Sequence, residues 1–201
     1  MRSSKKIFTP VVILALLGLA GLLISSQKIY ADQWQSQSAN SHLYFAPSWE
    51  GLPINGAFKQ FAVTLSRDEN DQPQSLSVSV QISSADMGTA DFNEAIQMTE
   101  WFNGSTFAEA VFNSNTITSV ESDDPRAQFI AQGILQLKGV ERNIQVPFSW
   151  SEPADGNALM AGALSLGRND FAIGTGEWAG GDQIGLAVKV WFDLVLESAN
   201  D

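Results

Sequence analysis

The sequence predicts an all-β fold, an eight-stranded antiparallel barrel with one short helix between its third and fourth strands. Three observations support this prediction. Apolar and polar residues alternate along most of the chain beyond residue 31, turn-forming residues separate the alternating runs, and the alternation is lost over residues 91–101. Regularly spaced strands with short connections favour antiparallel pairing, and eight such strands can close into a barrel without exposed edges.

The first 31 residues have the layout of a secretory signal peptide. Arg2, Lys5 and Lys6 precede an apolar run at residues 11–24, and a polar stretch separates that run from Ala31. We expect cleavage after Ala31, which leaves residues 32–201 as one exported domain. The alternative is an uncleaved N-terminal anchor, for which the apolar run is marginal in length.

Composition excludes several classes of site. The chain of 201 residues contains no Cys and a single His, His42. A thiol nucleophile, a disulfide and a Cys-ligated metal are therefore impossible, and so is a site with several His ligands from one chain. Residues 32–201 contain seven basic and 22 acidic residues, a formal charge of −15. Such acidity disfavours nucleic-acid binding, which requires clustered Lys and Arg.

The strand pattern is sharpest near the C-terminus, where apolar residues occupy nearly every second position from Ile184 to Leu196. One face of that strand is therefore apolar and the other is mixed. Pro147 lies within another run and lacks the N–H that a strand ladder needs, which predicts an edge or a bulge there. The eight predicted strands lie near residues 33–46, 52–66, 75–86, 107–120, 127–138, 141–152, 157–171 and 182–197.

Residues 91–101 predict the short helix. Thr89 or Asp91 can cap its N-terminus, and Glu94 lies in its first turn. Phe92 and Ile96 give it an apolar face. A helix at this point of the chain can lie across one mouth of the barrel.

No motif predicts catalysis or a metal site. A Ser–His–Asp arrangement would have to use His42, which lies in a predicted strand, and the sequence contains no G-x-S-x-G motif. The acidic loop at residues 68–71 lacks the spacing of a calcium-binding loop and is typical of a turn. The Gly-rich stretch at residues 173–181 is typical of a loop at a barrel rim. We therefore predict that the protein is not an enzyme.

The apolar content leaves two interpretations of the barrel interior. Six Trp and 12 Phe are a heavy aromatic load. An eight-stranded barrel can fill its interior with side chains or hold one small ligand, and alternation by itself does not distinguish these.

Short motifs, in order along residues 34–197, resemble those of the YceI family of bacterial periplasmic proteins. Trp34 opens the domain, and Trp101-Phe102 is similar to the family's double-aromatic site. The other matching segments are residues 40–45 (NSHLYF), 56–61 (GAFKQF), 77–86 (SVSVQISSAD), 107–114 (FAEAVFNS), 133–140 (GILQLKGV) and 168–174 (RNDFAIG). The resemblance implies a lipocalin-like barrel that binds a polyisoprenoid lipid, such as an isoprenoid quinone or a polyprenol, in its lumen. It implies no catalytic residues and no cofactor other than the bound lipid.

The physical chemistry of such a ligand agrees with the composition. An isoprenoid tail forms almost no hydrogen bonds, so its binding depends on burying apolar area, at about 0.8 kcal/mol per CH₂ group. The candidate ligand-binding residues are therefore apolar side chains. Those of the lumen are Phe61, Val78, Val80, Ile82, Phe112, Phe148, Val188 and Phe192, and those of the mouth are Phe92, Ile96, Trp101 and Phe102.

We thus expect a periplasmic protein that binds and carries a polyisoprenoid lipid, contacts membranes briefly and binds no nucleic acid. The alternative is an envelope stress-related interaction module or holdase that uses the apolar mouth on other proteins. A homodimer is compatible with either function.

Overall fold

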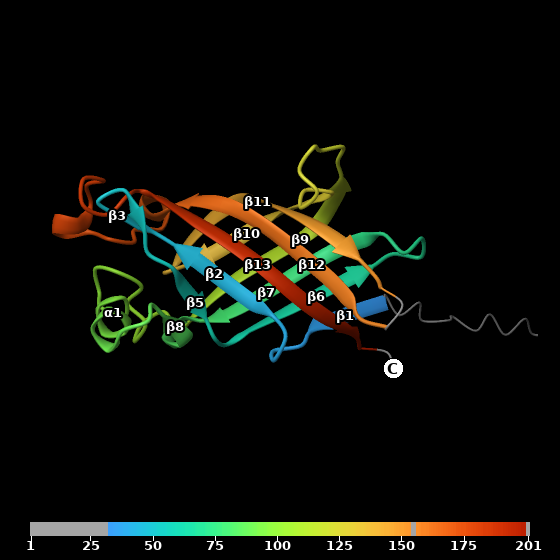
Figure 1. The fold of residues 1–201 in the computed structure, drawn as a ribbon, viewed down its shortest axis with the longest axis horizontal. Coiled ribbons are helices and arrows are strands. Elements are labelled where there is room, and N and C mark those ends of the chain that lie inside the picture. Colours follow the sequence, from blue (N-terminus) through green and yellow to red (C-terminus); the bar gives the residue numbers. More distant parts are fainter. Residues whose placement is uncertain (1–31, 154–155, 200–201) are drawn as a thin grey trace, which may run out of the picture. The chain divides into compact units, whose positions relative to one another are not determined.

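Eight antiparallel strands form a closed barrel in the computed structural model, which describes residues 32–153 and 156–199 (Figure 1). The barrel closes because β13 pairs with β12 along one side and with β1 on the other. The eight strands are β1 (Asp32–Ser36), β6 (Phe61–Arg67), β7 (Pro73–Gln81), β9 (Glu109–Ser119), β10 (Phe129–Leu137), β11 (Val140–Ser151), β12 (Ala158–Gly167) and β13 (Ala187–Ser198). The predicted signal peptide, residues 1–31, lies outside the described residues.

Three short strands extend the barrel at one end. They are β2 (His42–Ala46), β5 (Gly56–Phe58) and β8 (Ala85–Asp86), and they continue β1, β6 and β7 after short interruptions. β2 pairs with the first half of β13, and β5 lies between β2 and β8. A separate hairpin of β3 (Ser48–Trp49) and β4 (Leu52–Pro53) projects from the same end.

The eight predicted strands are confirmed, with differences at their ends. Three of them are interrupted, as described above, and residues 52–53 belong to the β3–β4 hairpin instead of the barrel. The seventh predicted strand stops at Gly167 and the eighth starts at Ala187. The intervening residues leave the sheet because their backbone carbonyls converge on the side chain of Arg168.

The predicted helix is confirmed in place but is shorter than expected. α1 spans Ala90–Ala95, and the side chain of Thr89 caps it by accepting a hydrogen bond from the amide of Phe92 at 3.3 Å. The helix ends early because the chain turns inward after Ala95, which buries Ile96 and Phe102. The other helical segments are the 3-10 turns η1 (Ile82–Ser84), η2 (Arg168–Phe171) and η3 (Gly176–Trp178).

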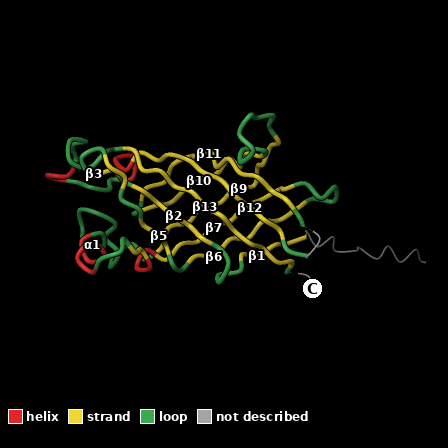
Figure 2. Tube along the Cα trace, in the orientation of Figure 1, coloured by secondary structure: helices red, strands yellow, loops and turns green. Residues whose placement is uncertain are grey.

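The helical segments gather toward one end of the barrel, the end that also carries the β3–β4 hairpin (Figure 2). Among the described residues, no helix has the length and apolar character needed to cross a lipid bilayer.

A tight turn at Lys138-Gly139 joins β10 to β11, between the strands predicted near residues 127–138 and 141–152. Both residues have positive φ angles, +50° and +74°, which is the geometry of a two-residue type I′ hairpin turn. Leu137 pairs with Val140 directly across the turn, so the register of the two strands is fixed from this point.

Pro147 lies where the ladder between β11 and β12 stops. β11 pairs with β12 from Phe148 onward, whereas its described residues 140–147 pair only with β10. The amide of Gln128, which precedes β10, donates to the carbonyl of Phe148 at 3.0 Å. The N–H and C=O of one residue in an antiparallel strand point to the same neighbour, so those of the even-numbered residues of β11 face β10 and those of the odd-numbered residues face β12. The backbone of Pro147 therefore faces β12, and because proline has no N–H it cannot donate the bond that would continue this ladder. This agrees with the irregularity predicted there. Residues 140–147 of β11 and 163–167 of β12 are therefore not paired with each other, and we call these two facing edges the β11–β12 seam.

Two apolar clusters fill the two ends of the barrel differently. The cluster at the end where β1 begins contains Phe148, Leu65 and Leu196, which are fully buried. The cluster at the α1 end contains Ile82, Ile96 and residues that follow Arg168. Phe148, Leu65 and Leu196 do not line the cavity described below, and we call their end of the barrel the solid end, whereas the second cluster borders that cavity.

Candidate functional site

An apolar cavity of about 210 Å³ extends into the barrel from the α1 end. Side chains of residues 96–102 and 171–173 cover that end, which we call the mouth. Of the described residues that line the cavity, only Arg168 carries an ionisable side chain. Such a space is suited to a slim apolar molecule, since an engineered apolar cavity of about 150 Å³ binds benzene.

Strand alternation builds the cavity wall. In β13 the even-numbered residues face the lumen, and in β7 and β9 every second residue does so. The inward residues of these three strands are Leu76, Val78, Val80, Ala110, Phe112, Val188, Val190, Phe192 and Leu194. The sequence pattern that predicts the strands therefore also sets the chemistry of the wall.

Ten of the twelve candidate residues line the cavity. They are Phe61, Val78, Val80, Ile82, Ile96, Trp101, Phe102, Phe112, Val188 and Phe192. They come from β6, β7, η1, β9, β13 and the turn after α1, so the fold brings together side chains that are more than 130 positions apart in the chain.

Phe148 and Phe92 are not among the residues that line the cavity. Phe148 faces inward but belongs to the solid end, where its ring lies 5.4 Å from that of Phe129. Phe92 is 41% exposed, because α1 buries none of its residues and the inward position falls to Ile96 after the helix ends. Period-two alternation identifies an inward face but not the depth along the barrel, and the inward face of a short helix depends on where that helix ends.

Several lining residues are absent from the set predicted from sequence. Phe45 of β2 and Phe58 of β5 lie with their ring centroids 4.8 Å apart, and both rings approach Phe102 of the mouth. Phe171 and Ile173 follow Arg168 and are buried beneath the mouth. The signals that could have identified them are the alternation within residues 40–45 and the apolar positions of residues 168–174, since both segments carry family motifs.

Arg168 holds the loop that borders the mouth. Its side chain is buried, and its Nε atom donates to the carbonyl of Gly185 at 3.1 Å. Its Nη atoms donate to five further carbonyls, those of Ile173, Gly174, Trp178, Gly180 and Ile184. All five N–H donors of a guanidinium are thereby engaged. Burial lowers the pKa of Arg168, and the ring of carbonyl dipoles stabilises its charge in place of a carboxylate.

The carbonyl of Glu100 ties the two halves of the mouth together. It accepts hydrogen bonds from the amides of Gly174 and Thr175 at 2.7 and 3.1 Å. Lys138 reaches the same carbonyl at 3.3 Å and that of Ala172 at 2.7 Å. Burial lowers the pKa of Lys138, and the Glu100 carboxylate opposes that shift.

A pair of indole rings joins the same two segments. The ring centroids of Trp101 and Trp178 lie 5.9 Å apart, and the Arg168 guanidinium lies 5.9 Å from the Trp101 ring. The mouth is therefore closed by side-chain packing and by hydrogen bonds to a few carbonyls, with no covalent link. Opening it requires the separation of these two segments.

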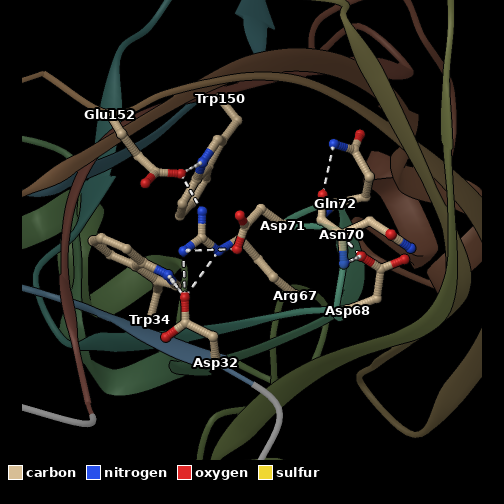
Figure 3. Close-up of polar contacts among 9 residues, drawn as sticks. All are labelled: Asp32, Trp34, Arg67, Asp68, Asn70, Asp71, Gln72, Trp150 and Glu152. Carbon is tan, nitrogen blue, oxygen red and sulfur yellow. Dashed lines mark hydrogen bonds and ion pairs between the residues drawn. The ribbon is translucent and has the colours of Figure 1, made fainter.

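The opposite end is sealed by Arg67. Its guanidinium bonds to Asp32 and Glu152, and it lies over the Trp34 ring at 5.1 Å (Figure 3). The indole N–H of Trp34 donates to Asp32 at 3.0 Å, and that of Trp150 donates to Glu152 at 2.7 Å. Burial acts to lower the pKa of Arg67, but its acidic neighbours outweigh this effect and raise the pKa. This network caps the solid end and does not line the cavity.

His42 lies on the outer face of the barrel. Its neighbour Leu43 lines the cavity, so His42 faces the other way, and its ring stacks on that of Tyr44 at 5.8 Å. Within residues 32–153 and 156–199, no three His, Cys, Asp or Glu side chains are grouped as metal ligands. The chemical character of the cavity is therefore that of an apolar container.

A family model described as a YceI-like domain matches residues 34–196. The chain belongs to the YceI-like family. This confirms the resemblance seen in the short motifs, and the YceI-like fold agrees with the closed, lipocalin-like barrel described above. No curated protein sequence matches the chain.

Solved structures of other proteins share this YceI-like fold. BcnA of Burkholderia cenocepacia is 25% identical, with a TM-score of 0.72 over 80% of this chain and 98% of that one. A polyisoprenoid binding domain from Saccharophagus degradans, implicated in plant cell wall breakdown, is 14% identical, with a TM-score of 0.61 over 84% of this chain and 99% of that one. The YceI protein of Campylobacter jejuni is 16% identical, with a TM-score of 0.56 over 74% and 86% of the two chains.

Proposed function

We propose that this YceI-like protein binds a polyisoprenoid lipid of the isoprenoid quinone or polyprenol type in its barrel and carries it through the periplasm. The observation that carries the proposal is the apolar cavity, whose described wall offers one ionisable group, already bonded to carbonyls. The family, and the polyisoprenoid binding domain among proteins of the same fold, support the ligand class. The proposed activity is binding without catalysis.

The energetics favour an apolar tail. One five-carbon unit has about 3–4 kcal/mol of transfer free energy when it is buried, and association costs roughly 4–15 kcal/mol. Several buried units therefore suffice for tight binding without any polar contact. The cavity has room for roughly one to two units on the scale of the benzene-binding cavity. A longer tail requires outward movement of the half-buried side chains at the mouth, such as Trp101.

Mass spectrometry of the intact protein tests the proposal most directly. Protein purified from a bacterial periplasm should carry a bound mass, which lipid extraction should identify as an isoprenoid. The stripped protein should then take up added ubiquinone, menaquinone or polyprenol. A protein that is free of lipid as purified and binds none of the three would contradict the proposal. Recovery of the chain from the cytoplasmic fraction would contradict the periplasmic location.

A second candidate, the interaction module or holdase, is favoured by the apolar side chains around the mouth. Leu52, Met98, Leu186, Phe92 and Trp49 are 72%, 50%, 43%, 41% and 38% exposed, and they belong to the β3–β4 hairpin, α1 and its following turn, and the loop before β13. Exposed apolar groups that gather at one end mark contact with a protein or a membrane.

A paired measurement separates the two functions. If the rim acts on proteins, the stripped protein should suppress the aggregation of an unfolding client, and Leu52→Ser together with Met98→Ser should abolish that effect without changing lipid affinity. If the lipid is the ligand, the same variant should retain polyprenol binding and the wild type should leave aggregation unchanged.

A further inference from the structure

We propose that Arg142, at the β11–β12 seam, binds the anionic phosphate headgroup of a lipid whose tail occupies the cavity. The inference rests on the proposed function and narrows it, because it selects polyprenyl phosphates over neutral polyprenols and quinones. It stands on three observations: the face of β11 that carries Arg142, the position of its guanidinium, and the distribution of basic residues in the domain.

Arg142 lies on the lumen face of β11. It pairs directly with Leu135 of β10, which in turn pairs with Phe112 of β9. Residues directly opposite one another in antiparallel strands share a face, and both Leu135 and Phe112 line the cavity. Arg142 nevertheless has an exposed side chain, whereas its inward-facing neighbours Val140 and Ile144 are half-buried. An arginine on an apolar inner face is accommodated here because β12 does not cover this part of β11.

The guanidinium lies along the seam. The N–H and C=O of Glu141, an odd-numbered residue of β11, point toward β12. They have no strand partner there among the described residues. The Nη1 atom of Arg142 donates to the Glu141 carbonyl at 2.9 Å and so satisfies this unpaired edge. The same contact keeps the exposed guanidinium close to Ile144, two residues along the strand, which lines the cavity, and we place the polar end of the bound lipid there.

Among the described basic residues, Arg142 alone has no ion pair, no ring contact and no hydrogen bond outside its own strand. The other six beyond residue 31 are engaged within the described structure. Lys59, Arg67 and Arg126 pair with carboxylates, Lys138 and Arg168 bond to carbonyls, and Lys189 lies over the Trp191 ring. Arg142 makes no ion pair with any described residue, and its one hydrogen bond leaves most of its five N–H donors for a ligand.

Charge favours this place over the rest of the surface. In a domain with 22 acidic and seven basic residues, the β10–β11 hairpin and η2, which border the seam, carry three of the seven, Lys138, Arg142 and Arg168, against two acids, Glu141 and Asp170. Arg168 cannot serve a ligand because its donors are filled by carbonyls. A planar guanidinium matches two oxygens of a phosphate, whereas the neutral head of a polyprenol offers a single hydroxyl.

Geranylgeranyl phosphate and geranylgeraniol test the inference, since they share one tail and differ in the head. Tryptophan fluorescence of the lipid-stripped protein reports binding because Trp101 lines the cavity. We expect wild type to bind the phosphate at least about tenfold more tightly than the alcohol, as hydrogen bonds to charged groups allow. In Arg142→Ala the two affinities should agree within about twofold, with that for the alcohol unchanged. Arg142→Lys should retain part of the preference.

Lys189→Ala is the matched control, since it removes an exposed cation from the outer face of β13 and should leave the preference intact. A wild type that does not distinguish the two ligands, or an Arg142→Ala protein that still does, would overturn the inference while the proposed function stands. Failure of wild type to bind either ligand, ubiquinone or menaquinone would instead refute the proposed function. Millimolar inorganic phosphate should not displace geranylgeranyl phosphate, and displacement would show a free-anion site in place of a lipid headgroup site.

Discussion

Val80 shows how one side chain ties the fold to the proposed ligand. It is 8% exposed and lies between Val78 and Ile82, which also line the cavity. Across the sheet it pairs with Ala110 of β9, another residue of the cavity wall. Val80→Asp would place an unpaired carboxylate in the apolar wall, which costs several kcal/mol when it must stay dry against a lipid tail. We expect polyprenol affinity to fall by at least about tenfold, measured by tryptophan fluorescence of the folded variant.

Ser77→Asp is the control for that substitution. Ser77 lies three residues away on the outer face of the same strand and is exposed, with its hydroxyl donating to Asn113 at 2.8 Å. The Ser77→Asp substitution introduces the same charge into β7 outside the lumen and should leave the polyprenol affinity unchanged. Equal affinity of the folded Val80→Asp protein and wild type would remove Val80 from the binding site.

Asp86 makes the anchoring of α1 sensitive to acid. Its carboxylate accepts from the amide of Gly88 at 2.9 Å and from the side chain of Asn93 at 3.2 Å. The Gly88 amide first, and then Asn93, lower the pKa of Asp86 from its ordinary value of 3.8. Because the folded-state pKa is depressed, the stabilisation is present above the ordinary value and is lost as the pH falls through the lower one.

Asp86→Asn isolates this charge, since the amide oxygen can still accept from Gly88. At pH 7 the variant should melt at a lower temperature than wild type, and the difference should shrink as the pH falls below about 4. Thermal unfolding followed between neutral pH and about pH 2.5 measures both effects. A difference in Tm that is constant across this range would show that the carboxylate charge has no part in it.

At the scale of elements, the β10–β11 turn fixes the register on which the lumen face of β11 depends. Gly139 has a φ of +74°, and a Cβ added there would lie 2.7 Å from a ring atom of Phe107. Gly139→Ala should therefore destabilise the protein by roughly 2–4 kcal/mol, from backbone strain together with the clash. Denaturant unfolding monitored by circular dichroism gives the free energy.

Gly51→Ala separates the two contributions. Gly51 has a similar φ of +82° in the β3–β4 turn, and a Cβ added there would meet no atom within 4 Å. It should cost about 1 kcal/mol, the strain alone. Equal losses in the two variants would mean that Phe107 yields without cost and that the turn is held by backbone geometry only.

At the scale of the whole molecule, the barrel is hollow at one end and solid at the other. Ala110 lines the cavity, and Ala131 lies fully buried in the packed cluster. Ala110→Phe should fill the cavity, fold as stably as wild type to within about 1 kcal/mol and lose polyprenol binding. Ala131→Phe overpacks a filled core and should cost about 1–3 kcal/mol or more. Denaturant unfolding and ligand titration of both variants provide the test.

Destabilisation of Ala110→Phe as large as that of Ala131→Phe would contradict a cavity at the α1 end. Retained polyprenol binding in a folded Ala110→Phe protein would mean that the lipid occupies another part of the molecule. Each outcome separates the shape of the interior from the identity of the ligand.

Local sequence determines much of this protein. Period-two alternation predicts the eight strands and the inward side chains. The structure has a turn at Lys138-Gly139, between two predicted strands, and ends the β11–β12 pairing next to Pro147, where the sequence predicts an irregularity. These features are readable because a strand's two faces and a turn's backbone angles depend on neighbouring residues. For the same reason ten of the twelve candidate residues lie on the cavity wall.

Tertiary structure alone decides where the barrel is hollow. Phe148 and Phe192 both face inward, but the first is fixed in the solid end and the second borders the cavity, because depth along the barrel depends on which strands pair and in what register. The same holds for Arg142, whose place in the sequence resembles any exposed arginine of a strand. Only the pairing of β10 with β11, and the missing pairing of β12 beyond Pro147, bring its charge to the edge of an apolar cavity.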